Sequence, residues 1–179
     1  MTDGDPDLSR YDDWLAFLRG LPGQVPQVRV VVVSGSAVTG GHDVHSDLDV
    51  QVWCDGPAPE TYDATMALVH DRFEVDHVWR VAAGAWPTAA QGFVHLQPDA
   101  ADLSRPTRLV DLWIDELPER LTVDVRRHGT PLVLHDPDGL LLLEPDDEAP
   151  MEAQRRRAVE DRKSTRLNSS HTDISRMPS

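Results

Sequence analysis

The sequence predicts an α/β fold of the α+β type, in which helices flank a mixed β-sheet. First, Val30–Val33 is a run of four β-branched residues, typical of a buried strand. Second, the first three predicted strands each follow a segment with helical spacing of apolar residues, whereas the later strands follow one another like hairpins. Third, 179 residues with 40% hydrophobic side chains suffice for one full core.

The N-terminal half is predicted to alternate helices with strands. Helices are expected where apolar residues recur every three or four positions, and strands where β-branched residues gather. Pro22-Gly23 and Gly56-Pro57 mark breaks between elements. In chain order the predicted elements are a helix over Leu8–Leu21, a strand over Val28–Ser34, a short helix over Ser36–Gly41, a strand over Ser46–Cys54 and a helix over Glu60–Arg72.

The C-terminal half is predicted to be richer in strands. Asp115–Arg127 is ambiguous, since Leu117, Leu121 and Val125 suit a helix while Thr122–Val125 suits a strand. A turn is expected over Asp136–Gly139. The remaining predictions are strands over Phe73–Val81, Gly92–Leu96, Arg108–Ile114 and Leu132–His135, and a polar helix beginning over Met151–Glu160. The tryptophans expected in the core are Trp53, Trp79, Trp86 and Trp113.

Charge and composition restrict the function. The formal net charge of -14 argues against a broad nucleic-acid surface, because phosphate contacts need clusters of Lys and Arg. We therefore expect no nucleic-acid partner. No apolar run approaches a membrane span, and Met1–Leu8 lacks the apolar core of a signal peptide. Together with the single cysteine, Cys54, this predicts a cytoplasmic protein with no membrane association.

The last residues differ abruptly in composition from the rest. Asp161–Ser179 reads DRKSTRLNSSHTDISRMPS and has no aromatic residue, no Val and no periodicity. It resembles in-frame translations of the two constant parts of a common sequencing-library adapter. We therefore expect a non-native tail over 161–179, preceded by the start of a truncated helical region over 151–160. Without its four cations and two anions the formal charge becomes -16, so the chain remains acidic.

Two aspartates at the start of the second strand suggest a metal site. The first strand ends at Ser34-Gly35-Ser36, a Gly-rich stretch follows, and Asp47-Leu48-Asp49 opens the next strand. Residues two apart in a strand project from the same face, so both carboxylates are expected to point the same way. Paired carboxylates repel each other unless a cation lies between them, and hard oxygen ligands suit Mg²⁺. An EF-hand calcium loop is excluded because the required Gly is missing from the sixth position.

The pattern GSAVTGGHDVHSDLDVQV resembles the nucleotidyltransferase superfamily of the DNA polymerase beta type, and especially aminoglycoside adenylyltransferases and related bacterial proteins. The resemblance rests on the strand, Gly35-Ser36, the eleven-residue step to Asp47 and the acidic pair. It is dense over residues 28–54 and looser as far as Gly139. It implies a catalytic domain over 1–150, with a mixed-sheet nucleotidyltransferase core.

The resemblance also implies a role for each matching residue. Gly35 would let the backbone approach a phosphate, and Ser36 with the following amides would bind the triphosphate. Asp47 and Asp49 would hold Mg²⁺, which neutralises the departing pyrophosphate. A third carboxylate would bind a second metal ion or deprotonate the acceptor hydroxyl. Three residues compete for this role. Asp111 has the required hydrophobic frame; the alternatives are Asp76, which has a similar frame directly after a helix, and Glu74, whose frame resembles the adenylyltransferase equivalent.

The expected activity is Mg²⁺-dependent transfer of a nucleoside monophosphate, AMP from ATP, to a hydroxyl with release of pyrophosphate. The acceptor is expected to be a small molecule or a side chain of a partner protein. Two other classes remain open, an antitoxin-like partner-binding module and an inactive nucleotide-binding domain. Because a helical C-terminal domain builds much of the acceptor pocket in larger relatives, this chain is expected to bind nucleotide weakly and turn over poorly.

Overall fold

The computed structural model describes residues 8–43, 45–96, 108–125 and 129–144, all of which belong to the unit Met1–Pro145. The described helical elements are η1 (Ser9–Tyr11), α1 (Asp12–Gly20), η2 (Leu21–Gly23), α2 (Ser36–Thr39) and α3 (Ala58–Arg72). The described strands are β1 (Val28–Ser34), β2 (Leu48–Cys54), β3 (Val75–Arg80), β4 (Ala89–Leu96), β5 (Arg108–Glu116), β6 (Leu121–Asp124), β7 (Leu132–His135) and β8 (Leu141–Glu144).

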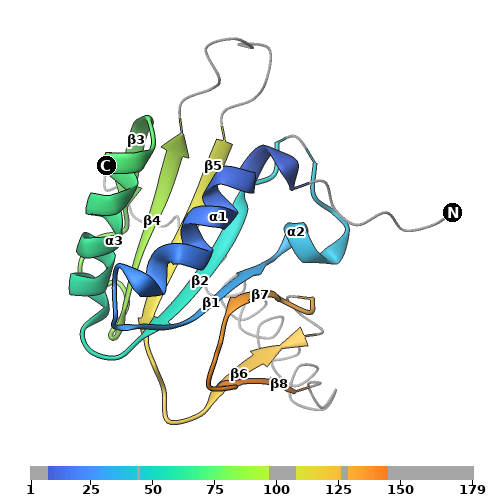
Figure 1. Ribbon diagram of the computed structural model, residues 1–179, viewed down its shortest axis with the longest axis vertical. Helices are drawn as coiled ribbons and strands as arrows, with labels where there is room; N and C mark the ends of the chain where they lie inside the picture. The colour runs from blue at the N-terminus through green and yellow to red at the C-terminus, as the bar shows by residue number, and fades with distance from the viewer. Residues whose placement is uncertain (1–7, 44, 97–107, 126–128, 145–179) are drawn as a thin grey trace, which may run out of the picture. The chain divides into compact units, whose positions relative to one another are not determined.

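The main sheet is mixed. Within the described residues it has six strands in the order β3-β4-β5-β2-β1-β7 (Figure 1). The neighbours β2 and β5 run parallel, and the other adjacent pairs run antiparallel. A parallel pair needs a crossover connection, and here the chain between β2 and β5 contains α3 and the hairpin of β3 and β4. The predicted mixed α/β sheet with flanking helices is confirmed.

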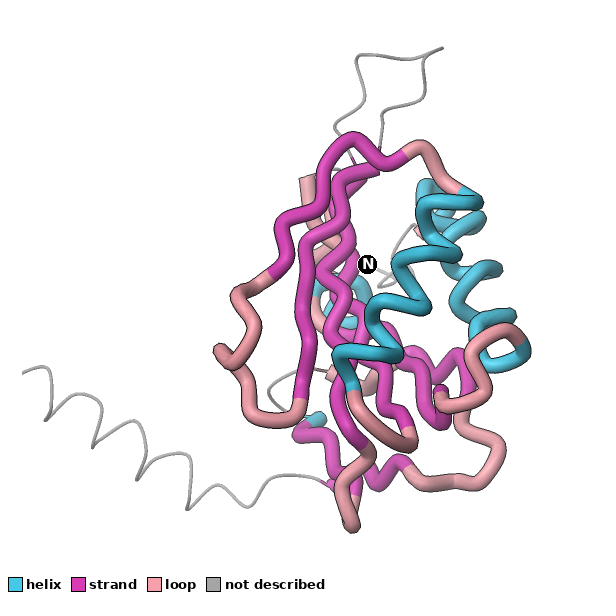
Figure 2. The backbone as a smooth tube through the Cα atoms, turned by 90° about the vertical axis from the view of Figure 1, so that its left-hand side faces the viewer, coloured by secondary structure: helices cyan, strands magenta, loops and turns pink. Residues whose placement is uncertain are grey.

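Helices α1 and α3 cover one face of this sheet, and Figure 2 shows both on the same side of the strands. Alternate strand residues point into this layer, such as Val50 and Val52 of β2 and Leu112 and Ile114 of β5. The fully buried aromatic side chains of this core include Trp14 and Phe17 of α1 and Tyr62 of α3. The strand residues between these positions, which include Asp49 and Asp111, therefore face away from the helices.

A smaller hydrophobic cluster lies on the opposite face of β1. There β6 and β8 form a parallel two-stranded sheet beside the main one (Figure 1). Its buried members are Val30, Val32, Trp53, Leu121 and Val123. The ambiguous segment Asp115–Arg127 thus contains the strand β6, whose residues Leu121 and Val123 pack against Val30 and Val32 of β1. No strand was predicted at β8, whose sequence Leu-Leu-Leu-Glu shows no alternation and whose partner is distant in the sequence.

The tryptophan prediction is partly wrong. Trp53 is buried, but Trp79 and Trp86 have 61% and 42% of their surface exposed. Trp79 lies on β3, an edge strand of the main sheet among the described residues, and Trp86 lies in the connection between β3 and β4. The predicted helix over Met151–Glu160 and the adapter-like tail fall outside the described residues. No described helix has both the length and the apolar character needed to cross a bilayer.

Candidate active site

Two aspartates from strands far apart in sequence lie side by side on the face of the sheet opposite α1 and α3. Asp49 of β2 is paired in register with Asp111 of β5. Residues directly opposite each other in a sheet have neighbouring side chains. Both aspartates alternate with fully buried core residues, so packing of Leu48, Val50, Val110 and Leu112 fixes their direction. Both side chains are half-buried.

Asp47 is held just before β2 by a hydrogen-bonded turn. The Asp43 carboxylate accepts hydrogen bonds from the His45 amide at 2.8 Å and the Ser46 hydroxyl at 2.9 Å. The Asp43 amide in turn donates to Ser46 Oγ at 3.0 Å. These bonds to the charged form lower the pKa of Asp43, the largest effect being that of the His45 amide. The turn therefore fixes the entry of the chain into β2, and with it the position of Asp47.

Tyr11 connects the segments that lead into the two acidic strands. Its hydroxyl lies 3.3 Å from the carbonyl oxygen of Ser46 and 3.1 Å from that of Leu109, two positions before Asp111. The ring is fully buried in the main core, and burial raises the pKa of the Tyr11 hydroxyl. A phenol donor that reaches both carbonyls holds the starts of β2 and β5 together. Nothing in the sequence pattern around Tyr11 indicated this contact.

Gly35 lies directly against the Asp49 carboxylate. It follows Ser34, the residue paired with Asp49, and its backbone has φ 68° and ψ -145°, a conformation that side chains disfavour. A Cβ at this position would overlap Asp49 Oδ2. Only glycine therefore allows both the turn after β1 and the close approach of the carboxylate. The next residue, Ser36, begins α2, and its Oγ lies 3.4 Å from His42 Nδ1.

The acidic side chains influence one another electrostatically. The pKa of Asp49 is raised to about 6, first by burial and then by the negative charges of Asp47 and Asp111. The pKa of Asp111 is also raised, mainly by burial, while a hydrogen bond from Gln91 opposes the rise and Asp47 adds to it. The three carboxylates thus form one coupled group. A cation among them would remove the repulsion.

The residues fit a hard divalent cation by their chemistry. Carboxylate oxygens are the ligands that Mg²⁺ prefers, and a group with mutual repulsion gains most from a positive charge. In the arrangement described, however, no three or more His, Cys, Asp or Glu side chains among the described residues converge closely enough to form a metal site. Side-chain rotations are therefore needed before Asp47, Asp49 and Asp111 share one ion. The Asp49 carboxylate has room for such a rotation only because position 35 is glycine, since a Cβ there would overlap Asp49 Oδ2.

The two alternative third carboxylates lie elsewhere. Asp76 is exposed on β3, which is separated from β2 by β4 and β5 in the sheet. Glu74 is exposed just before β3. The structure therefore brings Asp111 to Asp49 and leaves Asp76 and Glu74 at the far edge. Which carboxylate acts in catalysis stays a proposal.

The structure adds Gln91 of β4 to this group. Its side-chain amide donates to Asp111 Oδ1 at 2.9 Å and to Oδ2 at 3.1 Å. Trp86 donates from Nε1 to Gln91 Oε1 at 3.3 Å, and its ring packs against Trp113 with centroids 4.9 Å apart. Gln91 was missed because the predicted strand began only at Gly92. An amphipathic alternation traced back to Ala89 would have placed Gln91 on the face of Asp111.

Comparison with known proteins found distant structural likenesses. No family model and no curated protein matches the sequence. Among solved structures, the chain is similar to the Cid1 poly(U) polymerase with MgGTP bound, with a TM-score of 0.43 and 16% identity over 59% of this chain and 31% of that one. A Cid1 complex with its short product ApU gives a TM-score of 0.38 and 18% identity, covering 59% and 30% of the two chains.

A further Cid1 poly(U) polymerase structure gives a TM-score of 0.37 and 18% identity, covering 62% of this chain and 32% of that one. The chain thus spans about a third of the length of the Cid1 structures it matches. Likenesses this distant assign neither a family nor a substrate, so the function proposed below rests on the residues. The expectation that nucleic acid is not a partner stays a prediction.

Proposed function

We propose that this chain is a nucleotidyltransferase that moves a nucleoside monophosphate, AMP from ATP, to a hydroxyl of a small molecule or protein and releases pyrophosphate. The observation that carries the proposal is the pairing of Asp49 with Asp111 across parallel strands, with Gly35 against the Asp49 carboxylate. Carboxylates beside a glycine turn provide what a metal-bound triphosphate needs, namely hard oxygen ligands and close access to the backbone. The choice of AMP as the transferred group rests on the sequence motif, which resembles that of adenylyltransferases.

Each residue has a defined task in this scheme. Asp47 and Asp49, with Asp111, would hold Mg²⁺, which supplies charge neutralisation on the triphosphate when bound. Gly35 leaves space for a phosphate at the end of β1, and Ser36 offers a hydroxyl and an amide beside it. The acceptor oxygen attacks the α-phosphorus, the bond from this phosphorus to the bridging oxygen breaks, and pyrophosphate leaves with the electron pair.

Asp111 also suits the role of the base that receives the proton of the acceptor hydroxyl. Burial raises its pKa, so an Asp111 carboxylate that is not ligating the metal ion is a better proton acceptor than an ordinary surface aspartate. It lies beside Asp49 and is only half-buried. These properties favour Asp111 over Asp76 and Glu74.

The test uses ATP labelled at the α-phosphate, Mg²⁺ and a panel of hydroxyl acceptors that includes amino sugars, nucleosides, a short RNA and candidate partner proteins. We expect acceptor-dependent transfer of label that falls by about 100-fold or more in Asp47→Asn, Asp49→Asn and Asp111→Asn, since metal ligation supplies several kcal/mol to the transition state. The matched controls are Asp76→Asn and Glu74→Gln, which should stay within about twofold because their side chains lie at the exposed far edge.

Three outcomes contradict parts of the proposal. Loss of transfer in Asp76→Asn or Glu74→Gln, with activity kept in Asp111→Asn, would reassign the third carboxylate. Transfer to RNA alone would replace the proposed acceptor class. No transfer at all, together with tight partner binding that the aspartate substitutions leave unchanged, would favour a partner-binding module.

A further inference from the structure

His42 contacts the serine that the proposed function assigns to the triphosphate. Ser36 Oγ and His42 Nδ1 lie 3.4 Å apart, within hydrogen-bond distance. The chain leaves α2 through Gly40, whose left-handed backbone (φ 78°) turns it back. This turn brings the imidazole of residue 42 to the start of α2, where Ser36 follows the turn at Gly35.

Packing holds the His42 ring in place. The rings of Tyr11 and His42 meet edge to face, with centroids 6.0 Å apart and planes at 64°. Tyr11 is fully buried, and its hydroxyl reaches the carbonyl oxygens of Ser46 and Leu109. His42 itself is half-buried. Because the ring rests on a fixed neighbour, its Nδ1 atom stays directed at Ser36.

The direction of this hydrogen bond decides what Ser36 offers to a ligand. Phosphate oxygens accept hydrogen bonds, so Ser36 assists binding when its hydroxyl hydrogen points at the phosphate. If His42 Nδ1 carries a proton, the ring donates to Ser36 Oγ and the hydroxyl hydrogen is left for the ligand. If Nδ1 is unprotonated, the ring accepts the hydroxyl hydrogen, and the phosphate faces oxygen lone pairs instead. Only the first arrangement assists triphosphate binding.

We propose that His42 is a positioning residue that donates from Nδ1 to Ser36 and thereby directs the Ser36 hydroxyl at the triphosphate. Both the imidazolium and the neutral Nδ1–H tautomer provide this donor. The inference rests on the proposed function, because Ser36 has its task there. It adds a residue from the Gly-rich stretch before β2 to which the sequence motif gives no role.

The experiment measures binding of α,β-methylene-ATP with Mg²⁺ to the full chain by NMR titration, which also detects weak affinities. We expect Ser36→Ala to raise the Kd by about 10-fold, since a hydrogen bond to a charged ligand is lost. His42→Leu should raise it by about threefold, because a hydroxyl free among its staggered positions must be ordered by the ligand. His42→Asn, whose amide can donate from nearly the place of Nδ1, should stay within about 1.5-fold of wild type.

A double variant separates positioning from a merely structural role. Ser36→Ala combined with His42→Leu should bind no more weakly than Ser36→Ala alone, because His42 acts through Ser36. A structural role would weaken binding in both backgrounds. The matched control is His70→Leu, the same change at an exposed position of α3, which should leave the Kd unchanged.

A spectroscopic readout reports the proton itself. Long-range ¹⁵N–¹H correlation distinguishes protonated from unprotonated ring nitrogens, and with nucleotide bound Nδ1 of His42 should be protonated. An unprotonated Nδ1 in that complex would overturn this inference alone. Equal affinity in wild type and His42→Leu, or additive losses in the double variant, would do the same. Absence of nucleotide binding in the wild type would overturn the proposed function and this inference with it.

Discussion

Asp49 lies in an environment that disfavours its charge. It is half-buried, it stands beside Asp111, and the backbone of Gly35 packs against it. Such placement costs stability, and proteins retain it chiefly where a charge is needed for binding or catalysis. Among single residues, the stability lost by placing the Asp49 carboxylate here is the strongest sign of function.

The first prediction concerns the pH dependence of this cost. The pKa of Asp49 is about 6 in the folded chain against an ordinary value of 3.8, so the folded state binds more protons between these values. The free energy of unfolding therefore falls as the pH rises from about 4 to 6. Without metal, Asp49→Asn should be more stable than wild type at pH 7 by about 1–2 kcal/mol, a figure reduced for solvent screening.

Urea unfolding of both proteins at several pH values measures this difference. The advantage of Asp49→Asn should shrink as the pH falls from about 6 to 4 and be lost at lower pH, where the wild-type carboxyl is protonated in both states. Mg²⁺ with ATP should stabilise the wild type and have little effect on the variant. An Asp49→Asn protein that is less stable than wild type at pH 7 would contradict the proposed cost.

The second prediction concerns Gly35. A Cβ there would overlap the Asp49 carboxylate, in a backbone conformation open almost only to glycine. In urea unfolding, Gly35→Ala should therefore destabilise the chain by about 2–3 kcal/mol. The variant should also bind nucleotide less well, which a smaller stabilisation by Mg²⁺ with ATP would reveal.

Gly40→Ala is the matched control for Gly35→Ala. Gly40 also has positive φ, but the space around its Cβ position is open. This variant should cost only about 1 kcal/mol, the price of the left-handed conformation alone, and should keep nucleotide binding. Equal losses in the two variants would show that contact with Asp49 is not what requires glycine at position 35.

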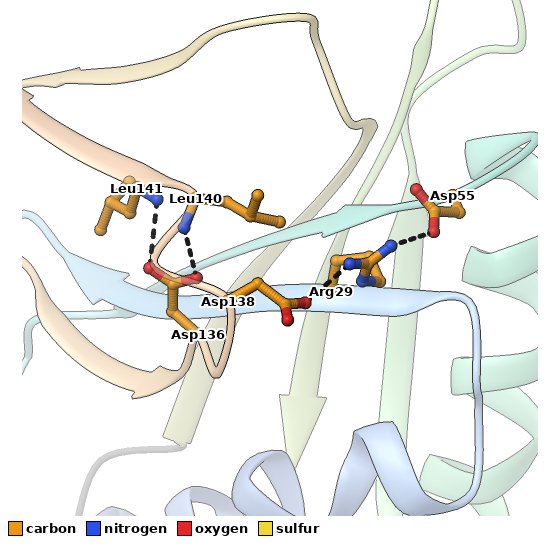
Figure 3. A network of polar contacts seen from close by, with 6 residues as sticks. All are labelled: Arg29, Asp55, Asp136, Asp138, Leu140 and Leu141. Atoms are coloured by element: carbon orange, nitrogen blue, oxygen red, sulfur yellow. Dashed lines mark hydrogen bonds and ion pairs between the residues drawn. The ribbon is translucent and has the colours of Figure 1, made fainter.

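At the scale of elements, the turn between β7 and β8 is fastened by side chains rather than by sheet pairing. The Asp136 carboxylate accepts the backbone N–H of Leu140 at 2.8 Å and that of Leu141 at 3.1 Å (Figure 3). Arg29 of β1 forms ion pairs with Asp138 in the same turn and with Asp55 after β2. These contacts link the turn to two strands of the main sheet.

The third prediction separates the two kinds of contact. Asp136→Ala should destabilise the chain by about 1–3 kcal/mol, because two backbone donors lose their charged acceptor. Asp138→Ala is the control, since an exposed ion pair contributes about 0–1 kcal/mol. Asp138 has 52% of its side chain exposed. Thermal or urea unfolding measures both, and a larger loss in Asp138→Ala would reverse the assignment.

At the scale of the whole molecule, the chain is strongly acidic, with a net charge of -14. Self-repulsion of a highly charged chain opposes the compact state, and salt screens it over about 10 Å at 0.1 M. The acidic group around Asp49 adds a local repulsion that a divalent ion relieves by binding. General screening and specific binding are therefore distinguishable.

The fourth prediction uses this distinction. The melting temperature should rise as NaCl increases from 10 to about 150 mM, by screening alone. About 5 mM Mg²⁺ with ATP should raise it further than NaCl of equal ionic strength. This additional rise should be absent in Asp49→Asn, while the NaCl effect remains. An identical response of wild type and Asp49→Asn to Mg²⁺ and ATP would mean that the ion binds elsewhere.

Much of the fold was predictable because its signals are local. The Val-rich run gave β1 with its observed bounds, and the helical spacing of Trp14, Leu15 and Leu18 gave α1. The motif from Gly35 to Asp49 located the candidate site, since its spacing lies within one stretch of chain. The exposure of Trp79 and the strand β8 were missed because each depends on which distant elements cover a segment.

The sequence by itself determined the acidic pair, the glycine turn and the order of helices and strands, because these follow from residue type and short-range periodicity. It left Asp111, Asp76 and Glu74 as competing third carboxylates. Only the tertiary structure decided which of them lies beside Asp49, through the parallel pairing of β2 and β5. It also brought Gln91 to Asp111, because strand register depends on packing across the whole sheet and no local pattern encodes it.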